Sequence, residues 1–185
     1  MSAPQDIGSI CYGWWAELTA ADLGRMRAEA AQLRRASTLV EVLTHPATHR
    51  LHQRLAKAGF DLRTQPQRLA LIVMVLAQVR SKGRGLARAL GQGDSPALSH
   101  LRFDRLIRTG AATTDDAGAL DLAQQLRRAL AQVNNVADVS ALARDLYWWN
   151  DRIRANWCFD YYGAAEAAPH FSKDTNDKTI EETGV

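Results

Sequence analysis

Residues 66–77 read PQRLALIVMVLA, and this stretch decides the fold class. Pro66 suits the first turn of a helix, where its missing N–H would be unpaired in any case. From residue 69 to residue 77 no polar side chain interrupts the apolar run, so the predicted helix has no face for water. Such a helix is normally central and covered by other helices, and this run is too short to span a bilayer. The stretch therefore predicts a soluble, multi-helix domain.

The flanking sequence continues the helical pattern, and no convincing strand alternation interrupts it. The predicted fold is all-α, a compact bundle of about seven to nine helices. The longest predicted helix covers residues 139–162, because Leu142, Leu146, Trp149, Ile153 and Trp157 follow one another in steps of three and four.

One domain is predicted over residues 1–163, with a candidate boundary between two packed helical subdomains near 110–116. Residues 164–185 are poor in apolar side chains and rich in Ser, Asp, Asn, Thr and Glu, which predicts a largely disordered acidic tail. The sequence shows no secretory signal, and its two cysteines are lone and unpatterned. We therefore expect a cytoplasmic protein.

Charge is strongly segregated along the chain. Residues 25–108 carry fourteen Arg and two Lys against five acids, while the chain as a whole has a net charge of only +3. A basic surface of this kind attracts polyanions, and the planar guanidinium group suits phosphate. The residues expected to bind nucleic acid through its phosphates are Arg34, Arg35, Lys82, Arg84, Arg88, Arg102, Arg105 and Arg108.

Catalytic and metal sites have little support. No nucleophile elbow, Cys-His signature or phosphate-binding glycine motif is present, so we expect neither an enzyme nor a cofactor. His45, His49 and His52 could share one side of a helix, but Arg50 and Arg54 beside them would repel a metal ion. We therefore predict no metal site there.

A helix-turn-helix is the alternative function. Residues 85–91 read GLARALG, and a polar turn then leads to a predicted helix over 96–108 with arginines on one side. This pattern is typical of a DNA-binding transcriptional regulator. Any two short helices joined by glycine look alike, however, so the pattern is not specific.

Several segments, in this order and spacing, resemble one known family. They are WW at 14–15, LRR at 33–35, GLARAL at 85–90, LRFDRLIR at 101–108, QLRRAL at 125–130 and LYWW at 146–149. Together they resemble the CasB-type small subunit of Cascade, the RNA-guided surveillance complex of type I-E CRISPR systems, over roughly residues 10–162.

The resemblance implies an all-helical, non-catalytic subunit that acts in antiviral defence. In that family two copies associate within the complex, support the guide RNA–target DNA duplex and hold the displaced DNA strand in a basic groove, while a separate nuclease-helicase cuts. The implied partners are guide RNA, target DNA, other Cascade subunits and a second copy of the chain. Base pairing would then supply the sequence specificity and the protein would bind the backbone.

Overall fold

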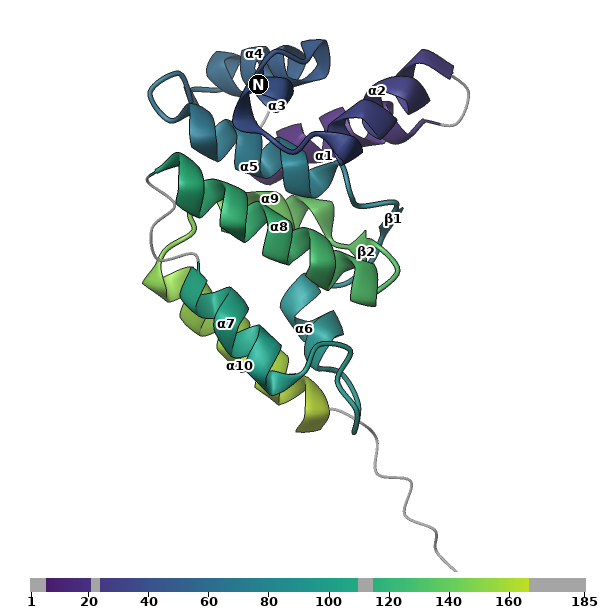
Figure 1. Ribbon diagram of the computed structural model, residues 1–185, viewed down its shortest axis with the longest axis vertical. Helices are drawn as coiled ribbons and strands as arrows, with labels where there is room; N and C mark the ends of the chain where they lie inside the picture. Colours follow the sequence, from purple (N-terminus) through teal and green to yellow (C-terminus); the bar gives the residue numbers. More distant parts are fainter. Residues whose placement is uncertain (1–5, 21–23, 110–114, 167–185) are drawn as a thin grey trace, which may run out of the picture.

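The computed structural model describes residues 6–20, 24–109 and 115–166, with side chains to residue 164. These residues form ten helices and one short pair of parallel strands, which confirms the predicted all-α class (Figure 1). In chain order the elements are α1 (Ile7–Thr19), α2 (Gly24–Arg35), α3 (Leu39–Leu43), α4 (Pro46–Lys57), α5 (Pro66–Leu76), β1 (Ser81–Lys82), α6 (Leu86–Gly91), α7 (His100–Thr109), α8 (Asp116–Gln132), β2 (Val136–Ala137), α9 (Val139–Tyr147) and α10 (Asp151–Glu166).

Helix α5 is central, as its sequence predicts. Every residue from Leu69 to Leu76 is buried, and Pro66 stands in the first turn. Helices α1–α4 lie on one side of α5, and α8 and α9 lie on the other, which joins the two halves of the chain around one core (Figure 1). None of the described helices is long and apolar enough to cross a membrane.

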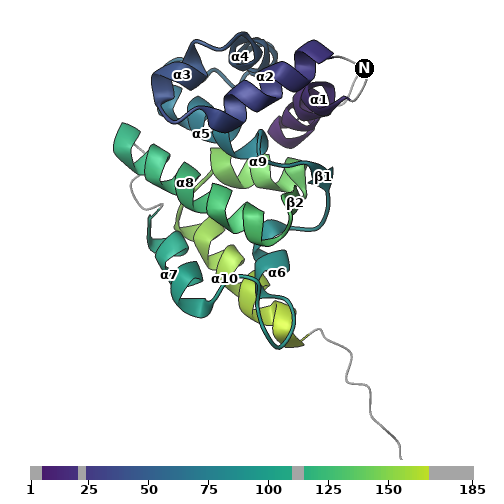
Figure 2. The same ribbon diagram turned by 45° about the vertical axis from the view of Figure 1, so that its right-hand side comes forward.

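The lower half in Figure 2 consists of α6, α7 and α10, packed below α8 and α9. Helix α7 begins at His100, four residues after the Pro96 start that the sequence suggests. The preceding loop instead folds back, and the Leu98 N–H donates to the carbonyl oxygen of Leu90 at 3.2 Å.

The prediction of a single long helix over residues 139–162 is wrong, because two helices, α9 and α10, cover this stretch. The additional helix brings the number among the described residues to ten, above the predicted seven to nine. Helix α9 ends at Tyr147, and the Asn150 side chain then accepts a hydrogen bond from the backbone N–H of Ile153 at 3.0 Å. An Asn in this position starts a new helix. The apolar spacing continues across the break because Trp149 and Trp157 are both buried and meet edge to face, 5.1 Å apart.

Two further predictions concern the tail, residues 164–185, and the candidate boundary near 110–116. Helix α10 continues to Glu166, so the first three residues of the predicted disordered tail are helical. The remainder of that tail, 167–185, and most of the candidate boundary near 110–116 lie outside the described residues.

Candidate nucleic-acid interface

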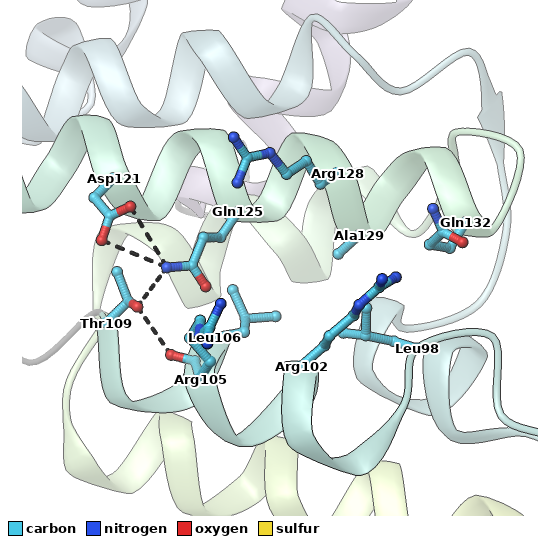
Figure 3. Close-up of a pocket in the computed structure, with 10 residues that line it drawn as sticks. All are labelled: Leu98, Arg102, Arg105, Leu106, Thr109, Asp121, Gln125, Arg128, Ala129 and Gln132. Atoms are coloured by element: carbon cyan, nitrogen blue, oxygen red, sulfur yellow. Dashed lines mark hydrogen bonds between the residues drawn. The ribbon is translucent and has the colours of Figure 1, made fainter.

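A groove of about 700 Å³ lies between α7 and α8. Figure 3 shows Arg102 and Arg105 rising from α7 and Arg128 lying along α8. Asp121, Gln125 and Gln132 supply the rest of the polar lining from α8. We call this lining, together with Thr109, the α7–α8 groove.

The rotation of α7 places its arginines in the groove. Phe103 and Leu106 are buried, and the Phe103 ring stacks almost parallel on Tyr161 of α10, with ring centroids 3.8 Å apart. Because neighbouring helical residues point about 100° apart, burying this pair leaves Arg102 and Arg105 beside α8. The packing of α7 on α10 therefore determines where these two positive charges lie.

The groove has an excess of positive charge. Arg102, Arg105 and Arg128 are exposed, and none of them forms an ion pair within the part of the chain that the structure describes. Its one carboxylate, Asp121, instead accepts from the Gln125 amide at 3.4 Å (Figure 3). Three guanidinium groups on two helices can bind successive phosphates of a nucleic-acid backbone.

The other predicted arginines of this region lie nearby but outside the groove. Arg108 pairs with Asp104 at 3.1 Å on the outer side of α7, Arg84 donates to the Gln92 amide oxygen, and Arg88 is exposed in the last turn of α6. The structure thus places Arg102 and Arg105 together in the groove and leaves these three outside it.

A second basic cluster lies where α2 ends against α5. Arg34 lies close to Arg80 and Arg35, and partial burial followed by these two charges lowers the pKa of the Arg34 guanidinium. The Gln78 amide donates to the Arg34 carbonyl oxygen at 3.3 Å, which fixes this junction. None of these three arginines forms an ion pair among the described residues, and a group of this kind also favours phosphate. We call Arg34, Arg35 and Arg80 the α2–α5 cluster.

Lys82 lies on β1 and contacts an aromatic ring. Its Nζ is 5.5 Å from the centre of the Tyr12 ring, a cation–π contact. Tyr12 lies 5.7 Å from Trp15, whose indole N–H donates to the Val79 carbonyl at 2.8 Å. The lysine charge is therefore positioned by α1 rather than by the groove.

Arg128 lines the α7–α8 groove but is not among the residues that the sequence predicts to bind nucleic acid. A usable signal exists, since Asp121, Gln125, Arg128 and Gln132 recur in steps of four and three along one ridge of α8. Such a polar ridge predicts a face that borders a groove rather than the core.

Of the three histidines in the candidate cluster, His45 and His52 have separate structural partners and His49 is exposed. His45 caps α4, where its Nδ1 accepts from the Ala47 N–H at 3.2 Å, and His52 lies 3.3 Å from Asp61. Across the described ranges no group of three His, Cys, Asp or Glu side chains could hold a metal ion. Burial raises the pKa of the Cys11 thiol to about 12, so it is a poor nucleophile.

The geometry does not favour a helix-turn-helix regulator. In such a protein the second helix is free to enter the major groove of DNA. Here α7 packs on both α8 and α10, and its Arg102–Arg105 side faces α8.

Comparisons with known proteins point to a single family. The family model of the CRISPR-associated protein Cse2 matches residues 29–162. A chain in the crystal structure of E. coli Cascade bound to a PAM-containing double-stranded DNA target is similar, with 26% sequence identity and a TM-score of 0.62. That similarity covers 84% of this chain and 96% of the E. coli chain. No curated protein sequence matches.

Proposed function

The chain belongs to the Cse2 family of CRISPR-associated proteins, and from that premise we propose that it is a non-catalytic subunit of a Cascade surveillance complex. In this role it acts in the cytoplasm with guide RNA, target DNA, the other Cascade subunits and a second copy of itself. It stabilises the guide RNA–target DNA duplex and the displaced strand through phosphate contacts that are independent of sequence.

The observation that carries this proposal is the charge of the α7–α8 groove. Arg102, Arg105 and Arg128 line it together with one carboxylate, Asp121, which is hydrogen-bonded to an amide. Such an arrangement suits a polyanion with regularly spaced charges. The α2–α5 cluster supplies a second point of attachment, and Lys82, Arg84, Arg88 and Arg108 extend the surface.

The decisive experiment replaces Arg102 and Arg105 by Glu in the full chain. Both side chains are exposed, so the thermal melt stays that of the wild type. Binding of single-stranded DNA, measured by filter retention at low salt, falls at least tenfold because two phosphate contacts become repulsive. When either the wild type or the double variant is co-expressed with the other Cascade subunits, we expect the purified complex to contain guide RNA. Target capture by the complex weakens only in the variant.

A matched control keeps the change in charge and moves it elsewhere. Lys57 at the end of α4 and Arg63 before α5 are exposed, and Figure 1 shows these two segments on the opposite side of α8 from α7. Replacing this pair by Glu lowers the net charge equally and leaves DNA binding within about twofold. Equal losses in the two double variants would refute a localised site and leave only a general charge effect.

A further inference from the structure

The outward face of α10 carries aromatic side chains that the core does not use. Phe159 is 77% exposed and Tyr162 is 50% exposed, although the neighbouring Tyr161 is buried. Arg152 is exposed two helical turns before Phe159, on the same face. We call Arg152, Phe159 and Tyr162 the α10 face. Scattered exposed apolar residues are ordinary, but rings interleaved with a cation are a more specific surface.

This face lies beside the α7–α8 groove, with only α7 between them. Helices α7 and α10 run antiparallel, because Arg154 donates to the Ile107 carbonyl at 3.2 Å while Tyr161 meets Phe103 near the other end. The His100 ring at the start of α7 lies 5.5 Å from the Tyr162 ring. The end of α10 that carries Tyr162 therefore lies beside the start of α7, and Figures 1 and 2 show the two helices side by side.

The outer side of α7 connects the two surfaces. Leu101, Arg105 and Arg108 border a shallow depression of about 400 Å³ on this side. Leu101 is 73% exposed. A path that leaves the groove at Arg105 therefore crosses this depression, which Asp104 also borders, before it reaches Tyr162. A helix with its side chains is about 10–12 Å wide, which a few nucleotides span.

We propose that the α10 face is a stacking platform for unpaired bases of a single strand whose phosphates lie in the α7–α8 groove. The proposal rests on the proposed function and adds a preference for single-stranded over double-stranded nucleic acid. Bases in a duplex are stacked on each other and leave no ring face free, whereas a single strand offers one at each nucleotide.

Charge selects this occupant over an apolar protein surface. Arg152 lies on the α10 face itself, and Arg105 and Arg108 outnumber Asp104 around the depression on the outer side of α7. The carboxylate of Asp160 instead lines a cavity between α6, α9 and α10, on another side of the helix. A ligand that covers the rings and crosses this depression meets an excess of positive charge, which suits bases linked by phosphates.

The test compares two probes that have the same phosphates. A labelled oligothymidine and an abasic oligomer of equal length are titrated with the full chain at low salt, and fluorescence anisotropy gives both affinities. We expect the wild type to bind oligothymidine about tenfold more tightly than the abasic probe. The Phe159→Ala/Tyr162→Ala variant loses this preference and binds the abasic probe like the wild type.

Two control variants isolate the rings. Phe159→Leu/Tyr162→Leu keeps apolar area without aromatic faces, and we expect it to lose the preference as well. Trp148→Ala removes another exposed aromatic residue, 55% exposed at the end of α9, and we expect it to keep the preference.

Each remaining outcome overturns the stacking platform. An unchanged preference in both double variants, or an equal loss on both probes, refutes stacking while the groove retains its role. A wild type that binds neither probe refutes the proposed function too. If sedimentation shows that the alanine variant dissociates a wild-type dimer while the base preference persists, the face is an interface between two copies.

Discussion

Arg127 donates through Nη1 to the backbone carbonyl oxygen of Ala36 at 2.8 Å, and this contact joins the two halves of the chain. Its Nη2 donates to the Leu33 carbonyl at 3.0 Å, and its Nε lies 3.4 Å from the Met74 carbonyl. One side chain of α8 therefore satisfies carbonyls at the end of α2 and in α5. The neighbouring Arg128 instead lines the α7–α8 groove, so we expect the two adjacent arginines to serve stability and binding separately.

Arg127→Ala tests the structural role. Removing the guanidinium loses three hydrogen bonds and leaves half-buried carbonyls without a donor, at a cost of about 3 kcal/mol. For a chain of this size the melting temperature falls by roughly 6–12 °C. Arg127→Lys retains the charge but reaches fewer carbonyls, so its melting temperature lies between those of the wild type and Arg127→Ala. Circular dichroism melts measure all three, and a loss of DNA binding without a loss of stability would contradict this role.

Arg128→Gln tests the neighbouring residue with the opposite expectation. The side chain is exposed, so its loss changes the free energy of unfolding by no more than about 0.5 kcal/mol. Each phosphate contact on a single strand contributes about 0.7 to the slope of log K against log salt, so the slope becomes shallower by that amount. Affinities of single-stranded DNA over a series of salt concentrations give the slope. An unchanged slope means that Arg128 touches no phosphate.

Gly91 allows α6 to approach α10 closely. A Cβ at this position would lie 2.0 Å from the carbonyl oxygen of Tyr161, and backbone of α10 cannot move aside cheaply. Gly91→Ala therefore destabilises the protein by about 3 kcal/mol, as overpacking does. Because Tyr161 carries the stack with Phe103, displacing it also shifts α7 and weakens DNA binding. Gly85→Ala is the control, since its Cβ meets nothing within 4 Å and its melting temperature stays near that of the wild type.

The sequence predicts most helices because their apolar periodicity and caps are local properties. Thr38 with Glu41 forms a capping box, and Asp138 caps α9. The break at Asn150 is not predictable from periodicity, because the buried stripe keeps its spacing when one helix ends and another begins at once. Short strands such as β1 and β2 cannot be predicted either, since two residues are too few to show the alternation of apolar and polar side chains.

The candidate site is predictable in its chemistry but not in its geometry. An excess of Arg over acids indicates phosphate binding, yet spacing alone cannot separate Arg102 and Arg105, which share the groove, from Arg108, which pairs with Asp104. The distinction depends on how Phe103 packs against α10, a contact across more than fifty residues of chain. Likewise, nothing local distinguishes Arg127 from Arg128. Their roles follow from which side of α8 meets α2 and α5.

Glu29 predicts how stability depends on acid. This buried carboxylate of α2 accepts from Arg50 of α4 and from Arg25 at 3.3 Å. Burial alone raises the pKa of Glu29, but the bonds and charges of Arg50 and Arg25 outweigh it, so the pKa lies below its ordinary value of 4.5. The pair therefore stabilises the fold above about pH 4.5, and this contribution is lost as the pH falls through the lowered pKa of the folded state.

Glu29→Gln consequently lowers the free energy of unfolding at pH 7 by about 2 kcal/mol, and the difference from the wild type shrinks towards pH 3. Chemical denaturation at a series of pH values measures it. Glu17→Gln is the matched control, because the Glu17–Arg54 pair is exposed and contributes less than about 1 kcal/mol. A difference between Glu29→Gln and the wild type that stays constant with pH would assign the loss to packing rather than to the charge on Glu29.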